Sequence, residues 1–274
     1  MDGYYNLIYD IDELKYFYEN ILPPLKSTEV YFVSLSARNK YLTNEEREYL
    51  DLGRTEMFCK NIVRKREWDR FKRTIRKFEC HKEGYTTRNG FSIPEKCMVC
   101  YVNINPSSTP RAIAEFKKVL SEYEIELSSI ALEGRQNSNN IAERLNKLDN
   151  SLMTAYQQSM GTKHWIDIDL DVEKQFKPYE NQVIKDYMQK KGLKTYYWID
   201  TKSGYHLLIR RDELKFNPEE LTSFCIEEEY KKYWINQVRI PEDNMDYEIV
   251  VNKNYMIPMP GTLQGGYPVS VIKC

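Results

Sequence analysis

A row of acidic residues on one face of a predicted strand constrains this chain more than any other feature. The segment KHWIDIDLDVEK, residues 163–174, alternates apolar and acidic residues with the period of a β-strand. Carboxylates are poor strand formers, and like charges lined up on one face of a strand repel one another. A neutralising cation would make such a row tolerable. The acids that share this face are Asp167, Asp169 and Asp171.

Bulk composition indicates a folded chain and gives no sign of a membrane protein. Of the 274 residues, 41% are apolar and 13% are aromatic, which is enough for a sizeable core. The formal net charge is only −1, so nucleic-acid binding has to be judged from the local distribution of charge. No apolar run approaches the length of a membrane span, and the N-terminus lacks the features of a secretion signal. We therefore expect a cytoplasmic protein without a membrane partner.

The cysteine positions suggest one candidate zinc site. Six cysteines are scattered through the chain, which fits a reducing compartment better than a disulfide scaffold. A zinc site would combine Cys80 and His81 with Cys97 and Cys100. However, CMVC opens a predicted buried strand, in which residues three apart point to opposite faces. We therefore favour a structural role for these four residues over zinc binding.

Residues 1–135 are predicted to form a mostly helical α/β module. The segment TEVYFVSLS at 28–36 predicts a strand. Thr43 and Glu46 have the spacing of a capping box, which predicts the start of the short helix NEEREYL. A second strand is expected at 97–105, with a helix behind it.

A long basic helix is also predicted in this module, over roughly 55–79. Trp68, Phe71 and Ile75 recur at the spacing of a core-facing helical stripe. A basic helix face is most often solvated surface, but the excess of lysine and arginine here also fits contact with a phosphate backbone. The predicted nucleic-acid contacts are Lys65, Arg66, Lys72 and Arg73.

Residues 141–274 are predicted to form a compact second module. The acidic strand comes first, a helix follows, and KTYYWID and YHLLIRR then form a hairpin around the turn TKSG. A polar helix is expected near 217–232, before the last strands. This order is typical of a small α+β sheet with helices on one face, as in RNA-recognition-type modules. The polar segment 133–140 is the predicted connection between the two modules.

Three short motifs of the second module suggest chemistry. Two aspartates at i and i+2 of a strand project in parallel and can hold two Mg²⁺ or Mn²⁺ ions, although the D-x-D pattern alone is a weak signal. Ser203 and Gly204 form a turn whose hydroxyl and N–H groups suit a phosphate, and His206 begins the strand that follows. The alternative is a hairpin with a polar tip and a partly buried histidine. Asp246 is a further acid at the start of an apolar strand.

The order of these motifs resembles the archaeo-eukaryotic primase superfamily. D-x-D at 167–169 is followed by S-G-x-H at 203–206, by Asp246 and by a P-G-T-L loop at 260–263. The match spans residues 163–266. It implies a single catalytic domain over the whole chain, in which an N-terminal α/β unit accompanies an RNA-recognition-motif-like sheet that carries the metal site.

The resemblance also implies roles for individual residues. Two Mg²⁺ or Mn²⁺ ions would be held by Asp167, Asp169 and Asp246. Since Asp171 is in phase with the first two, the pair 169/171 stays open. The residues implied to contact the nucleotide are Ser203, His206, Lys202 and Lys253, with Arg38 of the N-terminal unit as a further candidate.

The implied function is template-directed nucleotidyl transfer by a DNA primase or primase-polymerase. The substrates would be nucleoside or deoxynucleoside triphosphates and a single-stranded DNA template. Many members of the superfamily have a basic residue and a histidine where this chain has Pro258 and Gln264. The contacts that the P-G-T-L loop makes to the sugar or triphosphate would therefore differ in this chain. A metal-dependent nuclease and a non-catalytic subunit of a replication complex remain as alternatives.

The sequence and its resemblance to the superfamily also suggest partners and an origin for this protein. No helicase-type P-loop is present in the sequence, so unwinding of a duplex would need a helicase or another replication partner. The compact size and the loop departures also suit a viral or plasmid protein that acts in a host cell.

Overall fold

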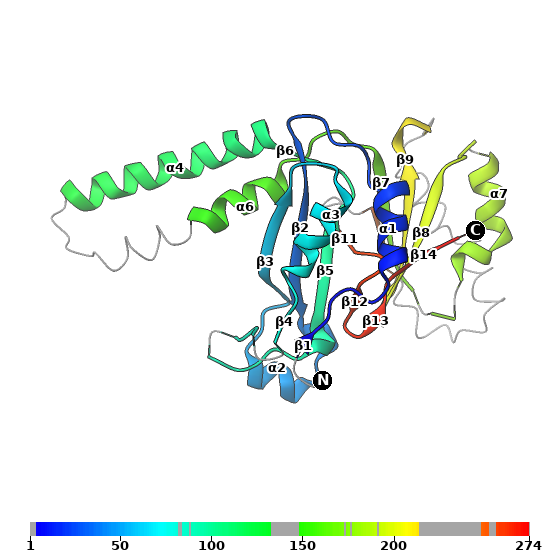
Figure 1. Cartoon of the computed structure of the whole chain (residues 1–274), viewed down its shortest axis with the longest axis horizontal. Helices are drawn as coiled ribbons and strands as arrows, with labels where there is room; N and C mark the ends of the chain where they lie inside the picture. Colours follow the sequence, from blue (N-terminus) through cyan, green and yellow to red (C-terminus); the bar gives the residue numbers. More distant parts are fainter. Residues whose placement is uncertain are drawn as a thin grey trace.

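Two antiparallel sheets form the framework of the protein in the computed structural model (Figure 1). Helices accompany both sheets, which confirms the predicted α+β class. The predicted connection at 133–140 and the predicted helix at 217–232 lie outside the described residues. The structure describes residues 4–81, 84–87, 89–132, 148–172, 174–175, 177–190, 192–213, 248–251 and 256–273.

The first sheet has the order β13-β12-β5-β2-β3, with β11 paired to β5 and β6 paired to β2. Its strands are antiparallel, and β2 lies between β3 and β5. The strands predicted at 28–36 and 97–105 are confirmed as β2 and β5. The bounds are β2 Glu29–Arg38, β3 Thr55–Val63, β5 Met98–Asn103, β6 Ser107–Ser108, β11 Met256–Pro258, β12 Leu263–Gln264 and β13 Tyr267–Pro268.

The second sheet has the order β10-β7-β9-β8-β14, and every neighbouring pair is antiparallel. The acidic segment forms β7, and the predicted hairpin is confirmed as β8 and β9. A separate pair joins β1 to β4. The bounds are β7 Trp165–Asp171, β8 Tyr196–Thr201, β9 Gly204–Arg210, β10 Glu248–Val251, β14 Ser270–Ile272, β1 Tyr4–Tyr5 and β4 Cys80–His81.

Helices lie between the sheets and around them. In Figure 1, α1 lies between the two sheets, whereas α4 and α6 extend together away from the body of the molecule. None of the described helices combines the length and the apolar character that crossing a bilayer requires. The bounds are α1 Ile11–Asn20, α2 Asn44–Leu50, α3 Trp68–Arg76, α4 Thr109–Leu132, α6 Leu148–Gln158 and α7 Gln182–Lys190; short 3-10 helices are η1 Asn39–Tyr41, η2 Glu95–Cys97, η3 Pro178–Glu180 and η4 Arg211–Glu213.

One hydrophobic core joins the two sheets. Phe17 of α1 is fully buried in a cluster that includes Leu35 of β2 and Leu208 of β9. Trp165, the first residue of β7, belongs to the same cluster, and its indole N–H donates to the carbonyl oxygen of Ile21 at 2.9 Å. Because both sheets bury apolar area against the same helix, their relative position is determined by this core.

The predicted long helix at 55–79 is wrong in its first half. Residues 55–63 form β3, which pairs with β2 along almost its whole length, and the helix α3 covers only Trp68–Arg76. The core spacing was correct within that helix, because Phe71 and Ile75 are fully buried. Strand pairing against a buried neighbour outweighs local helix propensity, so β3 forms despite its pattern. By contrast, the capping box that opens α2 is confirmed.

The C-terminal segment does not stay within the predicted second module. The strand β11 pairs with β5 and β12 also pairs with β5, so residues 256–264 complete the first sheet. Only β14 returns to the second sheet, where it pairs with β8. Ile257 and Met259 are fully buried, so this apolar segment requires a covered position, which pairing along the edge of β5 provides. The expected division at 135–141 therefore does not describe the end of the chain.

The carboxylate of Glu29 joins the start of β2 to the segment before β7 by hydrogen bonds. We expect the loss of this side chain to destabilise the fold. One carboxylate oxygen accepts from the Thr162 N–H and hydroxyl at 2.7 and 2.6 Å, and the other accepts from the Lys26 N–H at 3.0 Å. We expect Glu29→Ala to lower the free energy of unfolding by about 2–4 kcal/mol, because two backbone donors lose their acceptor. Chemical denaturation at neutral pH measures this loss, with Glu115→Ala on the exposed face of α4 as the control.

The stabilisation by the Glu29 carboxylate should decrease in acid. Burial alone would raise the pKa of Glu29, but the hydrogen bonds from Thr162 and Lys26 outweigh it and lower the pKa below its usual value. A carboxylate whose pKa is lower in the folded state stabilises the fold above its unfolded pKa and loses this effect as the pH falls through the folded value. The stability difference between wild type and Glu29→Ala should therefore shrink in strong acid, and an unchanged difference would contradict the assignment.

Candidate active site

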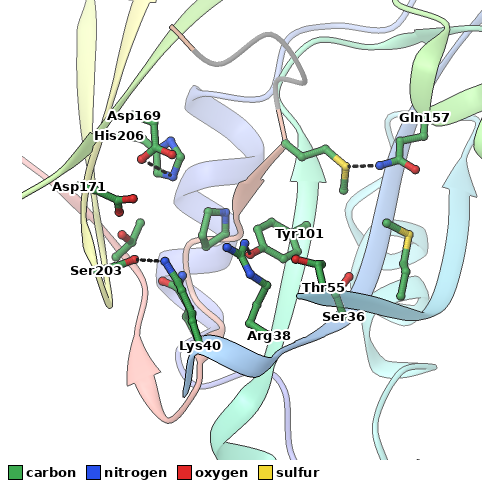
Figure 2. Close-up of a pocket in the computed structure, with 15 residues that line it drawn as sticks. Ser36, Arg38, Lys40, Thr55, Tyr101, Gln157, Asp169, Asp171, Ser203 and His206 are labelled. Carbon is green, nitrogen blue, oxygen red and sulfur yellow. Dashed lines mark hydrogen bonds and ion pairs between the residues drawn. The ribbon is translucent and has the colours of Figure 1, made fainter. Parts of the chain in front are cut away.

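A cavity of about 290 Å³ lies where the two sheets face each other (Figure 2). Its volume far exceeds the space needed by a single water molecule. Strands β2, β3 and β5 of the first sheet contribute one wall, together with β11 and β12 from the C-terminal segment. Strands β7, β8 and β9 contribute the opposite wall. The cavity therefore collects side chains from distant parts of the sequence.

The first wall is the face of β2 that carries the even-numbered residues. Val30 and Phe32 at its beginning are buried against α4 and α6. Towards its end, the same face becomes polar, and Ser36 and Arg38 line the cavity. The guanidinium of Arg38 donates to the hydroxyl of Tyr101, on the neighbouring β5, at 2.7 Å. The alternation along β2 thus brings a cation to the cavity without interrupting the strand.

The second wall is the acidic face of β7. The predicted alternation is confirmed, since Ile168 and Leu170 are buried. The three acids are not equivalent, however. Asp169 and Asp171 line the cavity, whereas Asp167 is fully buried and does not line it. Of the two pairs that the sequence left open, the structure brings 169/171 to the cavity.

His206 lies between two of these carboxylates. In the pairing of β7 with β9 it stands directly opposite Asp169. Its Nδ1 lies 2.9 and 3.2 Å from the two carboxylate oxygens of Asp167, and its Nε2 lies 3.7 Å from Asp169 Oδ1. The ring lines the cavity although only 7% of the side chain is exposed. The structure therefore brings the D-x-D and S-G-x-H motifs into contact.

The pKa values of Asp169 and His206 on the acidic wall are both raised. Burial raises the pKa of Asp169 to about 6, and the carboxylates of Asp167 and Asp171 add to this effect. Burial of His206 favours its neutral form, but the carboxylates of Asp167 and Asp169 outweigh it and raise the pKa of the ring. Burial is the main cause of the first shift, and the neighbouring carboxylates cause the second. The carboxylates that face the cavity therefore fit a divalent cation that prefers oxygen ligands.

Lys40 is a site residue that sequence reasoning missed. It lies in η1 directly after β2 and lines the cavity, and its Nζ donates to the hydroxyl of Ser203 at 2.9 Å. Figure 2 shows Lys40 reaching from the first sheet towards Ser203 and Asp171. The signal in the sequence was the polar alternation of Ser34, Ser36 and Arg38 at the end of an otherwise apolar strand.

Lys202 has a structural position instead. Its backbone N–H donates to Gln264 Oε1 at 2.8 Å, and its Nζ donates to the carbonyl oxygen of Gly265 at 2.7 Å. Its ammonium also lies 4.3 Å from the ring centre of Tyr41. Gln264 and Pro258 both line the cavity. Gln264 thus connects the hairpin that carries Ser203 to the C-terminal segment.

Gly204 allows this hairpin to approach β7, and we expect Gly204→Ala to damage the site. A Cβ at this position would collide with the carbonyl oxygen of Leu170, and the backbone φ of +153° disfavours a side chain as well. The collision should lower the free energy of unfolding by about 2–3 kcal/mol, measurable by chemical denaturation. Gly53→Ala is the control, because a Cβ there would meet no atom within 4 Å. Equal stability of both variants would contradict this account.

The structure does not bring the predicted nucleic-acid contacts to the cavity. The helix α3 packs on the other face of the first sheet, where Phe71 contacts the ring of Tyr31. Arg66 donates to three backbone carbonyls at the end of α1, and Lys72 pairs with Asp69 at 3.3 Å. Arg73 lies within α3, and Lys65 lies in the short connection between β3 and α3.

Two predicted residues, Asp246 and Lys253, lie outside the described residues. Within the described ranges, no group of three or more histidines, cysteines or acids is placed to hold a metal ion. Cys80, His81, Cys97 and Cys100, all of which lie in the described ranges, therefore form no such group. Cys97 is buried, and its thiol donates to the carbonyl oxygen of Pro94.

Comparisons with known proteins add no relative. No family model matches this chain, and searches of curated proteins and of solved structures find no match either.

Proposed function

We propose that this protein is a template-directed nucleotidyltransferase of the archaeo-eukaryotic primase type. One observation carries the proposal: Asp169 and Asp171 face Arg38 and Lys40 across a single cavity, with Ser203 beside them. A nucleoside triphosphate with divalent cations needs such a place, since carboxylates attract the cations and basic groups attract the phosphates. An N-terminal unit followed by an acid-bearing sheet is also the order that the resemblance implies.

Asp169 and Asp171 would hold the cations, and Asp246 is the third ligand that the resemblance implies. Two protein carboxylates are enough to bind Mg²⁺, because water and substrate phosphates usually supply its remaining ligands. Bound ions of this kind lower the pKa of an attacking 3′-hydroxyl and offset the charge that develops on pyrophosphate.

The remaining cavity residues would orient the triphosphate. Lys40 and Ser203, which now contact each other, offer an ammonium and a hydroxyl at one place. Arg38 is held by Tyr101 and offers its other guanidinium N–H groups, and His206 offers Nε2. Holding the α-phosphate in line with a hydroxyl lowers the entropic part of the barrier, so positioning supplies much of the rate. That hydroxyl belongs to a second nucleotide in priming and to a primer end in extension.

An incorporation assay tests the proposal directly. The full chain is incubated with single-stranded DNA, Mn²⁺ or Mg²⁺ and labelled NTPs or dNTPs, with and without a primer. We expect short labelled products that disappear when the metal is chelated. Cleavage of the template without incorporation would indicate a metal-dependent nuclease instead. Strand binding without any turnover would indicate a non-catalytic subunit, and either result would refute the proposal.

A further inference from the structure

Asp167 lies beside the proposed metal site but does not belong to it. Its side chain is 0% exposed, whereas the side chain of Asp169, two residues later on the same face of β7, is 39% exposed. Both carboxylate oxygens of Asp167 face Nδ1 of His206. A cation at Asp167 would have to displace the imidazole and enter a place that is closed to solvent. Asp167 therefore needs a role other than metal binding.

The apolar neighbours of Asp167 on β7 and β9 do not by themselves call for a carboxylate at this position. Trp165 precedes Asp167 on the same face, and Leu208 stands directly opposite it on β9. Both neighbours belong to the core around α1. An apolar side chain of similar size would extend this core, whereas a buried charge requires a partner to offset its desolvation. His206 is a direct partner of this carboxylate, with its Nδ1 2.9 Å from Asp167 Oδ1.

The contact between Asp167 and His206 determines which ring atom faces the cavity. The two residues are diagonal neighbours, because His206 stands opposite Asp169 in the strand pairing. A carboxylate on Nδ1 orients the imidazole and specifies Nδ1 as the nitrogen that donates. Nε2 then points towards Asp169 and the cavity, where the proposed function places the triphosphate.

We propose that Asp167 is a positioning residue, whose buried carboxylate holds His206 through Nδ1 so that Nε2 faces the triphosphate of the bound nucleotide. This inference rests on the proposed function for the identity of the ligand. The orientation of the ring itself does not depend on that function and can be measured separately.

The decisive variant is Asp167→Asn, which keeps the shape of the side chain and removes its charge. Nitrogen NMR of the imidazole rings reports the state of Nδ1 and Nε2, and the chain has only three histidines, so His206→Gln assigns the signal. In the metal-free wild type, we expect a slowly exchanging proton on Nδ1 of His206. In Asp167→Asn we expect this signal to shift or broaden. A wild-type ring without a proton on Nδ1 would overturn the proposal even if the variant failed to fold.

Binding measurements separate positioning from metal ligation. Calorimetry gives the Kd for Mn²⁺ alone and the Kd for a triphosphate analogue that cannot be cleaved at the α-phosphate. For Asp167→Asn we expect an unchanged Kd for Mn²⁺ and a triphosphate Kd that is higher by about tenfold. Combining Asp167→Asn with His206→Gln should add nothing to the effect of His206→Gln, because the carboxylate acts through the ring.

Asp169→Asn is the matched control and should give the opposite pattern. We expect it to raise the Kd for Mn²⁺ by at least about tenfold while leaving the hydrogen bond at Nδ1 of His206 in place. If Asp167→Asn weakens Mn²⁺ binding as much as Asp169→Asn does, Asp167 is a ligand and the inference is wrong. If the proposed function fails, the wild type will lack incorporation, whereas the NMR result on His206 will still decide the role of Asp167.

Discussion

Asp169→Asn is expected to lower nucleotide incorporation by about 10³-fold, equivalent to about 4 kcal/mol of transition-state stabilisation. The physical reason is the loss of a carboxylate that faces the cavity and, under the proposed function, would attract the divalent ions. Asp171→Asn should act in the same direction, because Asp171 lines the same wall. Steady-state incorporation with saturating template, measured over a range of Mn²⁺ concentrations, checks this prediction. Excess metal should restore part of the activity.

The fold of Asp169→Asn should be at least as stable as the wild type when no metal is bound. Burial and the neighbouring carboxylates raise the pKa of Asp169 to about 6, so its charged form is disfavoured in the folded protein. A neutral amide removes that repulsion. Thermal denaturation in chelator should therefore show an equal or higher Tm. The control is Asp186→Asn on the exposed face of α7, which should change neither activity nor Tm. Full activity of Asp169→Asn would refute the metal assignment.

Lys40→Ala should lower kcat/KM for the nucleotide by about 10²-fold, the usual effect of losing one donor to a developing charge. The ammonium of Lys40 lies against Ser203 at the border of the two walls, where it could reach a phosphate that the acids would hold through cations. Most of the loss should appear in KM if Lys40 acts in binding, and in kcat if it contacts charge that develops in the transition state. Rates at varied nucleotide concentration distinguish the two.

The matched control for this variant is Lys118→Ala. Lys118 is 67% exposed on α4, where it pairs with Glu115 one turn earlier. Its removal should leave kcat/KM unchanged, because an exposed pair of this kind contributes little to stability. If both lysine variants retain wild-type kinetics, the basic wall does not bind the triphosphate and the proposed orientation of the substrate is wrong.

Local patterns were sufficient where a short segment determines its own structure. The alternation of β7, the hairpin of β8 and β9 and the capping box at Thr43 and Glu46 all match their predictions. In each case the interacting residues are close in sequence. The helix predicted over 55–79 was wrong at β3, because pairing with β2 is a long-range interaction that the local pattern does not contain.

The composition of the cavity was only partly predictable for the same reason. Ser203 and His206 were identified from one turn, and both line the cavity. Lys40 was missed because its contact with Ser203 spans 163 residues. The basic face of α3 looked suitable for a template strand, but it lies behind the sheet that lines the cavity. Amphipathic spacing identifies which side of a helix is polar, but it does not indicate which side of a sheet the helix covers.

The sequence by itself determined that three aspartates share one face of a strand and that a histidine follows on the next hairpin. Period-two geometry requires the first, and the S-G-x-H motif predicts the second. Only the tertiary structure decided how deep each acid lies. Asp167 is buried because the shared core around α1 extends along β7 as far as this residue, and Asp169 and Asp171 lie beyond that core at the cavity. Burial depends on what packs against a strand, and strand periodicity carries no information about that packing.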